Sequence, residues 1–246
     1  MKRSKITILL AIVLGMTFHS CLDLEPQDQL GGKNMWTSVN DYKQFANTFY
    51  SWTRDFSSVV YDGTHSDKRS DLITYQSYNE FSRGINSIPS SDANYTDNYK
   101  HIRRTNLLLQ NAEAYAKPED IKQYIGEAYF FRAYSYFDLL QLYGDVIITK
   151  KPLDITDPEM KVKRNDRSEV VDLIIDDLNH AVENLPAFKE LTTEEEGRIS
   201  KEGAQAFLSR VALYEGTWQK SRNGNQNTQR SANLLDIAVK AARAVS

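Results

Sequence analysis

The sequence predicts a mainly α-helical fold, in which helices pack as neighbouring pairs and carry an irregular, loop-rich lobe. Three observations support this. Residues 126–145 are rich in large aromatic side chains, with the small Ala128 and Ala133 among them, which is typical of a helix buried on most of its surface. Apolar residues recur every three to four positions over much of residues 95–218. By contrast, residues 57–96 show no clean period and are rich in Ser, Asp, Gly and Tyr.

The first twenty residues are predicted to be a lipoprotein signal peptide. An apolar run over residues 6–16 follows a basic start and is too short to span a membrane. The single cysteine, Cys21, comes directly after the small Ser20, where a bacterial lipoprotein is cleaved and acylated. We expect Cys21 to be the lipid anchor and residues 21–36 to form an extended acidic tether. The alternative is an ordinary secretory signal with a chance cysteine.

Helices are then expected, in order, over residues 37–56, 95–115, 118–143, 166–185, 200–218 and 231–246. Aromatic and apolar residues of the first segment lie on one stripe. Pro118 suits a first helical turn, and Gly144 ends the helix that follows. Asp166 and Glu169 match the capping-box pattern, in which each side chain accepts a hydrogen bond from the other residue's backbone amide.

The helices form pairs over residues 95–143 and 166–218, and a third pair begins at 231–246. The pairs start roughly 65–70 residues apart, about twice the 34-residue period of tetratricopeptide (TPR) repeats. Ala133 and Phe137 match the Ala-x-x-x-Phe element of that repeat. We therefore expect residues 37–246 to form one domain on a TPR-like scaffold. Because Ser246 lies inside a helical pattern, we expect the chain to be the N-terminal part of a longer protein.

Composition excludes several functional classes. The net charge of −3 argues against a nucleic-acid partner, which needs a basic face. One cysteine excludes an intramolecular disulfide and a cysteine-based metal site. His101 and His180 have no partners at metal-ligand spacing, so no metal or other cofactor is expected. No catalytic motif is present, although a glycosidase with two carboxylates distant in sequence stays open.

Several motifs together resemble one family, the SusD/RagB outer-membrane nutrient-binding lipoproteins of Bacteroidetes. The signal peptide and the acidic leader are part of this resemblance. The motifs themselves are the following: Tyr99-x-x-Ile102-Arg103-Arg104-x-Asn106, Gly126-Glu127-Ala128-x-Phe130-x-Arg132-Ala133, Tyr143-Gly144-Asp145, Arg167-x-Glu169-Val170 and Gly197-Arg198-Ile199-Ser200-Lys201. The resemblance extends over residues 1–246, and members of the family are about twice as long.

The resemblance implies a function and a location. Such proteins are lipid-anchored at the exposed face of the outer membrane. They capture oligosaccharides, or peptides in RagB-like branches, and deliver them to a SusC-like TonB-dependent transporter. They are not enzymes and hold no cofactor. The alternative is a scaffold or interaction protein with no glycan site in this chain.

Candidate ligand-binding residues lie in the irregular region before the first paired helix. Sugars need flat ring faces for their CH groups and polar side chains for their hydroxyls. The candidates chosen on this basis are Asp67, Arg69, Tyr75, Tyr95 and Asn98. The resemblance implies ligand contacts near Asp67 and at Tyr95, where members of the family often have Trp. The competing interpretation is that each is a solvated or locally packed loop residue.

Two polar residues fall among apolar neighbours on the paired helices, namely Asn106 and Arg132. Buried polar groups must be hydrogen-bonded, because unpaired burial is costly. We expect both residues to have structural roles. The aromatic residues of 129–143 are likewise expected to form the core rather than a ligand-stacking surface.

Overall fold

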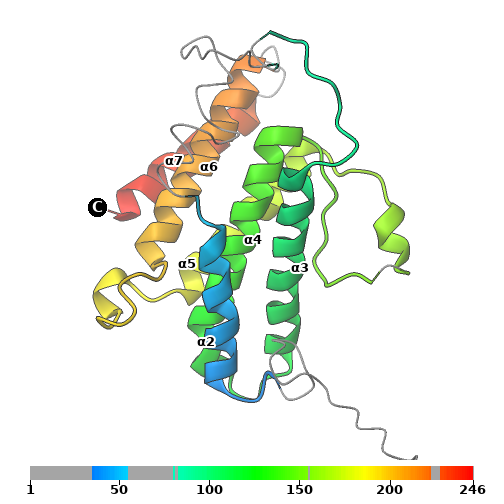
Figure 1. Ribbon diagram of the computed structural model, residues 1–246. Helices are drawn as coiled ribbons and strands as arrows, with labels where there is room; N and C mark the ends of the chain where they lie inside the picture. Colours follow the sequence, from blue (N-terminus) through cyan, green and yellow to red (C-terminus); the bar gives the residue numbers. More distant parts are fainter. Residues whose placement is uncertain (1–34, 55–79, 81–82, 155, 223–227, 246) are drawn as a thin grey trace, which may run out of the picture. The chain divides into compact units, whose positions relative to one another are not determined.

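Helix α4 (Lys122–Tyr143) is buried on most of its surface, and helices α3 and α5 pack against it (Figure 1). The computed structural model describes residues 35–54, 80, 83–154, 156–222 and 228–245. The elements below all belong to the compact unit Trp36–Ser246, one of two units into which the chain divides.

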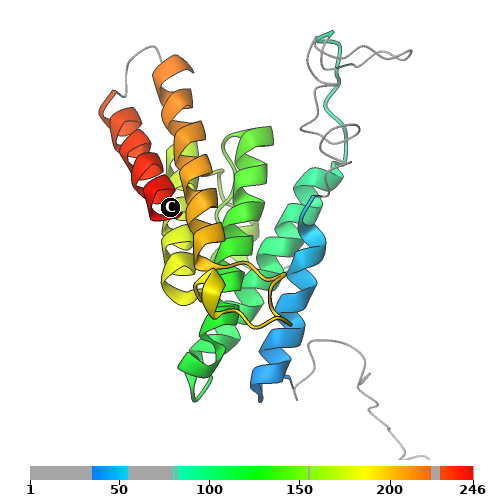
Figure 2. The same cartoon turned by 90° about the vertical axis from the view of Figure 1, so that its left-hand side faces the viewer.

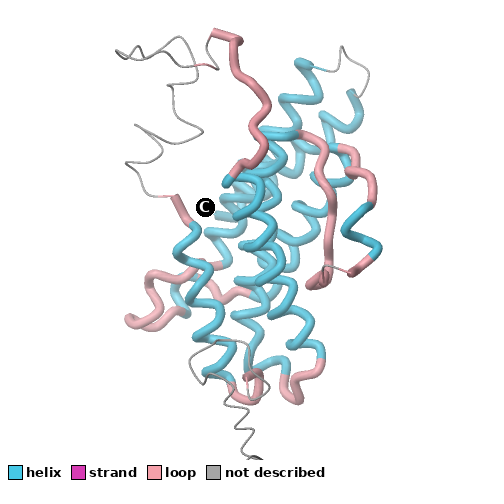
Figure 3. Tube along the Cα trace, turned by 45° about the vertical axis from the view of Figure 1, so that its right-hand side comes forward, coloured by secondary structure: helices cyan, strands magenta, loops and turns pink. Residues whose placement is uncertain are grey.

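The elements of this unit are all helical. In chain order they are α2 (Val39–Asn47), η1 (Thr48–Trp52), α3 (Ala93–Glu113), η4 (Pro118–Ile121), α4 (Lys122–Tyr143), η5 (Pro158–Lys161), α5 (Arg167–Asn184), η6 (Phe188–Glu190), α6 (Lys201–Arg222) and α7 (Thr228–Val245). Figure 3 shows these helices joined by loops, with no strand drawn among the described residues. The predicted helical fold class is confirmed.

Successive long helices pack against one another. The heaviest contacts join α3 with α4, α4 with α5, α5 with α6, and α6 with α7. Figure 2 shows this succession from α2 to α7. The arrangement is that of neighbouring helical pairs, as the periodicity predicts. No helix among the described residues is long and apolar enough to cross a membrane.

Local signals fix where the helices begin and end. The backbone N–H of Asp166 donates to Glu169 Oε2 at 3.1 Å, which is the Glu169 half of the predicted capping box. Helix α3 begins at Asp92, whose carboxylate accepts from the backbone N–H of Asn94 at 2.9 Å. Helix α4 ends at Gly144, which has a φ of 72° that glycine adopts readily.

Helix α4 comes close to the end of helix α5 at Gly126. A Cβ atom there would lie 2.9 Å from Leu185 Cγ, closer than side chains tolerate. The sequence pointed to Ala128 and Ala133 as positions of close approach, and both are fully buried. Gly126 is a further small residue on α4, and any side chain there would require Leu185 to move.

A buried polar network connects α3, α4 and α5. Arg132 donates from Nε and Nη2 to the two carboxylate oxygens of Asp177 at 2.8 and 2.6 Å, and from Nη1 to Asn106 Oδ1 at 2.8 Å. Arg132 is 5% exposed, Asn106 1% and Asp177 0%. The structure thus places Asn106 and Arg132 in the interior, hydrogen-bonded to each other. Asp177, on the third helix, completes the network.

Two further buried carboxylates pair with arginines across element boundaries. Arg198 donates from Nε and Nη2 to the two oxygens of Glu127 on α4, both at 2.7 Å. Arg167, at the start of α5, donates from Nε to Glu215 Oε2 on α6 at 2.9 Å. Both carboxylates are fully buried. These pairs fix α6 and the segment before it against the rest of the bundle.

His101 on α3 packs against Trp52 at the end of η1. The two rings stack with centroids 4.1 Å apart and an interplanar angle of 15°. Burial lowers the pKa of His101 from its ordinary value of 6.5 to about 4, against a smaller opposing effect of the Asp97 carboxylate. Its positive neighbours Lys100 and Arg104 act in the same direction as burial. The imidazole is therefore neutral at pH 7.

We expect Arg132→Met to destabilise the protein by about 3–5 kcal/mol, because it leaves the Asp177 carboxylate buried without its cation. The double variant Arg132→Met, Asp177→Leu should recover most of that loss, because it removes both charges. Urea unfolding followed by far-ultraviolet circular dichroism measures both. A single variant as stable as the parent protein would contradict this account of the network.

We expect His101→Phe to reduce the loss of stability on acidification. The folded pKa of about 4 lies below the ordinary value of 6.5, so protons favour the unfolded chain between these values. The contribution of the neutral imidazole is complete above pH 6.5 and is lost as the pH falls towards 4. The phenyl ring keeps the stack on Trp52 but cannot titrate. Unfolding curves at pH 7, 6, 5 and 4 that fall in parallel for both proteins would refute this prediction.

Candidate functional site

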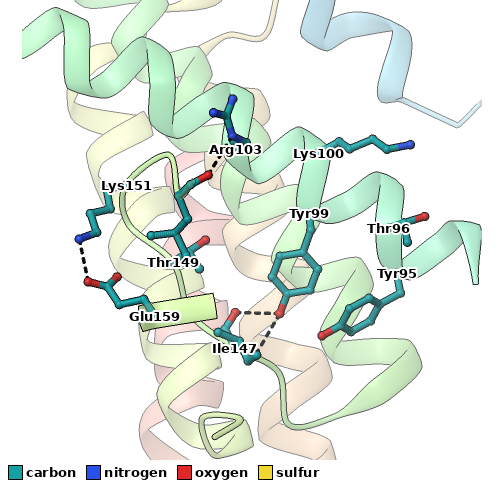
Figure 4. Close-up of a pocket in the computed structure, with 10 residues that line it drawn as sticks. Tyr95, Thr96, Tyr99, Lys100, Arg103, Ile147, Thr149, Lys151 and Glu159 are labelled. Carbon is teal, nitrogen blue, oxygen red and sulfur yellow. Dashed lines mark hydrogen bonds and ion pairs between the residues drawn. The ribbon is translucent and has the colours of Figure 1, made fainter. Parts of the chain in front are cut away.

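A pocket of about 430 Å³ lies between α3 and the loop that follows α4. Two tyrosines, two threonines, two aliphatic residues and four charged residues line it: Tyr95, Thr96, Tyr99, Lys100, Arg103, Ile147, Thr149, Lys151, Leu153 and Glu159. Figure 4 shows the α3 residues on one side and the loop residues on the other. The pocket therefore joins side chains about fifty residues apart in sequence.

The loop after α4, which carries Ile147, Thr149, Lys151 and Leu153, forms one wall of the pocket, here called the loop wall. Side chains on the helices, rather than a neighbouring strand, hydrogen-bond to its backbone. Tyr99 Oη donates to the carbonyl of Ile147 at 2.8 Å and accepts from its N–H at 2.9 Å (Figure 4). Tyr136 Oη accepts from the N–H of Thr149 at 2.7 Å and donates to its carbonyl at 3.2 Å. Burial raises the pKa of both phenols, so both stay protonated and can donate.

Asn106 adds a third support for the wall. Its Nδ2 lies 3.0 Å from the carbonyl of Thr149 and 3.3 Å from that of Lys151, while its Oδ1 accepts from Arg132. At the base of the loop, the N–H of Asn165 donates to the carbonyl of Val146 at 2.9 Å. The wall is thus tied directly to the buried network of the bundle.

Tyr95 lies in the first turn of α3, at the mouth of the pocket. Its ring contacts Tyr99 at a centroid distance of 4.8 Å and meets Tyr143 edge-on at 5.3 Å. Tyr143 Oη donates to Asp92 Oδ2 at 2.6 Å, which ties the end of α4 to the start of α3. Tyr95 is half-buried, so these neighbours orient its ring while part of it stays accessible.

Asn98 lies one turn from Tyr95 but is only 7% exposed. Its Nδ2 donates to Asp138 Oδ2 at 3.0 Å and to the carbonyl of Asn94 at 2.8 Å. Asp138 also forms an ion pair with Arg54. The amide group of Asn98 is therefore engaged by the protein, and Asn98 does not line the pocket.

The other predicted ligand residues, Asp67, Arg69 and Tyr75, lie outside the described residues, as does the predicted anchor Cys21. Within the described part, Tyr95 is the predicted residue that lines the pocket. Sequence reasoning missed Tyr99 and Arg103 as site residues. The signal was present, because Tyr95, Tyr99 and Arg103 recur every four residues and so share one helical face.

Each charged residue of the pocket has an ion-pair partner. Lys151 Nζ lies 2.7 Å from Glu159 Oε1, a half-exposed ion pair that lies on one side of the pocket. Lys100 Nζ lies 2.7 Å from Asp97 Oδ1 on the same helix. Arg103 Nε donates to the carbonyl of Leu153 at 3.3 Å, and its Nη2 lies 3.8 Å from Asp154 Oδ1.

Comparison with known proteins places the chain in a family. Residues 22–213 match a SusD-like family model described as "Starch-binding associating with outer membrane". Two SusD-like proteins of Formosa agariphila, P38 and P2, are each 28% identical to this chain. The matches cover 87% and 90% of this chain but only 42% and 45% of the relatives, so the chain spans less than half of their length.

Solved structures show the same similarity. A SusD-like protein of Bacteroides fragilis is 25% identical, with a TM-score of 0.65 over 88% of this chain and 40% of that one. A laminarin-binding SusD-like protein is 29% identical, with a TM-score of 0.51 over 65% of this chain and 32% of its own. Because the family model covers most of the chain, this protein belongs to the SusD-like family.

Proposed function

We propose that this protein is a cell-surface lipoprotein that captures oligosaccharides for import by a SusC-like TonB-dependent transporter. The proposal rests on the pocket beside Tyr95, where two tyrosine rings lie next to hydroxyl and charged side chains. Aromatic faces receive the CH groups of a sugar ring, and the polar side chains bind its hydroxyls.

The two tyrosines have different roles in this proposal. Both hydrogen-bonding directions of the Tyr99 hydroxyl are used by Ile147, so Tyr99 offers its ring face alone. Tyr95 is half-buried, so part of its ring stays accessible to a ligand. We therefore assign the stacking role to Tyr95, while Tyr99 holds the loop through Ile147 and shapes the pocket.

The family supports a glycan as the ligand class. The family model is described as starch-binding, and one related structure is of a laminarin-binding protein. Neither description identifies the glycan that this chain binds, because related proteins differ in the glycans that they bind. The role is binding and delivery, so the ligand leaves the protein chemically unchanged.

The predicted lipid anchor supports placement at the outer membrane. Cys21 follows a signal-like segment, and the family is described as associating with the outer membrane. Acylation of Cys21 would hold the protein at the membrane, beside the transporter. The acidic tether that follows would let the domain reach its ligand at the cell surface.

We expect the purified chain to bind at least one glycan in a calorimetric panel of oligosaccharides, with peptides tested in parallel. Tyr95→Ala should weaken that binding about tenfold, because stacking on an aromatic face is worth about 1 kcal/mol or more. Tyr115→Ala, just beyond the opposite end of α3 and outside the pocket lining, is the matched control. Mass spectrometry should recover the ligand intact. Binding of peptides alone, or no effect of Tyr95→Ala, would overturn the assignment of this pocket to glycans.

We expect Cys21→Ala to abolish lipid attachment. Metabolic labelling with a radioactive fatty acid should mark the parent protein and leave the variant unlabelled, and the variant should lose its membrane association on cell fractionation. Cys21 is the only cysteine, so a labelled variant cannot be explained by another thiol. Equal labelling of both proteins would show that the lipid is attached elsewhere.

A further inference from the structure

We propose that the pocket beside Tyr95 selects an oligosaccharide that carries an anionic group, a carboxylate or a sulfate, and that Arg103 is the residue that selects it. This inference rests on the proposed function, and it adds the chemical class of the ligand and a specificity-determining residue. It rests on the way in which Arg103 is held and on its place along α3 after the two tyrosines.

Three cations, Lys100, Arg103 and Lys151, line the pocket with one carboxylate, Glu159. Each cation has a carboxylate beside it. Lys100 Nζ lies 2.7 Å from Asp97, Arg103 Nη2 lies 3.8 Å from Asp154, and Lys151 Nζ lies 2.7 Å from Glu159. The charges around the pocket are therefore balanced, so an anionic ligand is selected by the geometry of one cation rather than by an excess of positive charge.

Arg103 is oriented for recognition. Its Nε donates to the carbonyl of Leu153 at 3.3 Å, which holds the plane of the guanidinium. Its Nη2 lies 3.8 Å from Asp154 Oδ1, beyond hydrogen-bonding distance, and Asp154 is 83% exposed. Within the described part of the chain, the Nη edge thus has a nearby charge but no hydrogen-bonded carboxylate. Such an edge fits the paired oxygens of a carboxylate or sulfate.

Lys100 is less suited to this role. Its ammonium is engaged by Asp97 at 2.7 Å on the same helix, and both groups are at least half exposed. In Figure 4 its side chain extends away from the loop wall, whereas that of Arg103 is tied to it. Lys100 is thus already paired, whereas Arg103 is the cation whose orientation is fixed by the loop.

The spacing along α3 matches the size of a sugar unit. Tyr95, Tyr99 and Arg103 follow one another at four-residue steps, and Figure 4 shows them in that order along the helix. Each step advances about 6 Å along the axis. A sugar ring on the tyrosines can therefore place a charged substituent at Arg103.

The test is a matched glycan panel with the full chain, in which each of several oligosaccharide backbones is supplied in a neutral, a carboxylated and a sulfated form. We expect at least one acidic form to bind about tenfold more tightly than its neutral parent, because hydrogen bonds to charged groups are the stronger ones. Raising the ionic strength should reduce that preference. The two acidic forms distinguish a uronate from a sulfate ester.

Three variants distinguish a specific role of Arg103 from a general effect of positive charge on the protein. Arg103→Gln should abolish the preference for the acidic form while retaining binding of the neutral parent, and Arg103→Lys should restore it only in part. Lys163→Gln removes the same charge from an exposed site outside the pocket and should leave the preference intact. Arg103 is half exposed, so all three variants should fold, which thermal unfolding verifies.

The outcomes distinguish the inference from the proposed function. Equal, Tyr95-dependent binding of neutral and acidic forms would overturn the inference and leave the function standing. An acidic preference that survives Arg103→Gln, or that Lys163→Gln removes equally, would overturn the role of Arg103. Absence of binding to every glycan would overturn both.

Discussion

The need to satisfy one buried cation, Arg132, constrains much of this structure. An arginine taken out of water costs several kcal/mol unless a carboxylate and further hydrogen bonds compensate it. Arg132 obtains both from two other helices, with Asp177 on α5 and Asn106 on α3. The three helices must therefore keep one relative position for the network to stay intact. These hydrogen bonds, at 2.6–2.8 Å, and the close approach of α4 to Leu185 at Gly126 both hold the helices in one position.

The same network determines where the candidate site lies. Asn106 accepts from Arg132 with one end of its amide and donates to the carbonyls of Thr149 and Lys151 with the other. The loop wall is thus an extension of the core polar network, and Tyr99 and Tyr136 complete its attachment. A ligand in the pocket meets a surface that is already ordered, so little conformational entropy is lost on its binding. In this protein, the residues that stabilise the bundle also build the site.

The sequence predicts the helices well, because caps, stop signals and the three-to-four-residue period are local properties. It also identifies Asn106 and Arg132 as polar residues among apolar neighbours, but it cannot identify Asp177 as their partner, since that contact joins residues 45 apart. For the site, Tyr95 was chosen because the resemblance implies a ligand contact at an aromatic residue one turn before Tyr99. Lys151, Leu153 and Glu159 were not predictable, because the loop that carries them has no period and its position depends on distant tyrosines.

Specificity in such a site must come from its periphery. The hydroxyl of Tyr99 and the amides of Asn98 and Asn106 would each suit a sugar hydroxyl, but the protein itself uses all three. Structural hydrogen bonds therefore use these polar groups, so they are not available to a ligand. What is left for a ligand is accessible ring surface at Tyr95 and charged side chains at the rim. Ring surface accepts many sugars, because most present a CH face. The rim charges are consequently the groups that can tell one glycan from another.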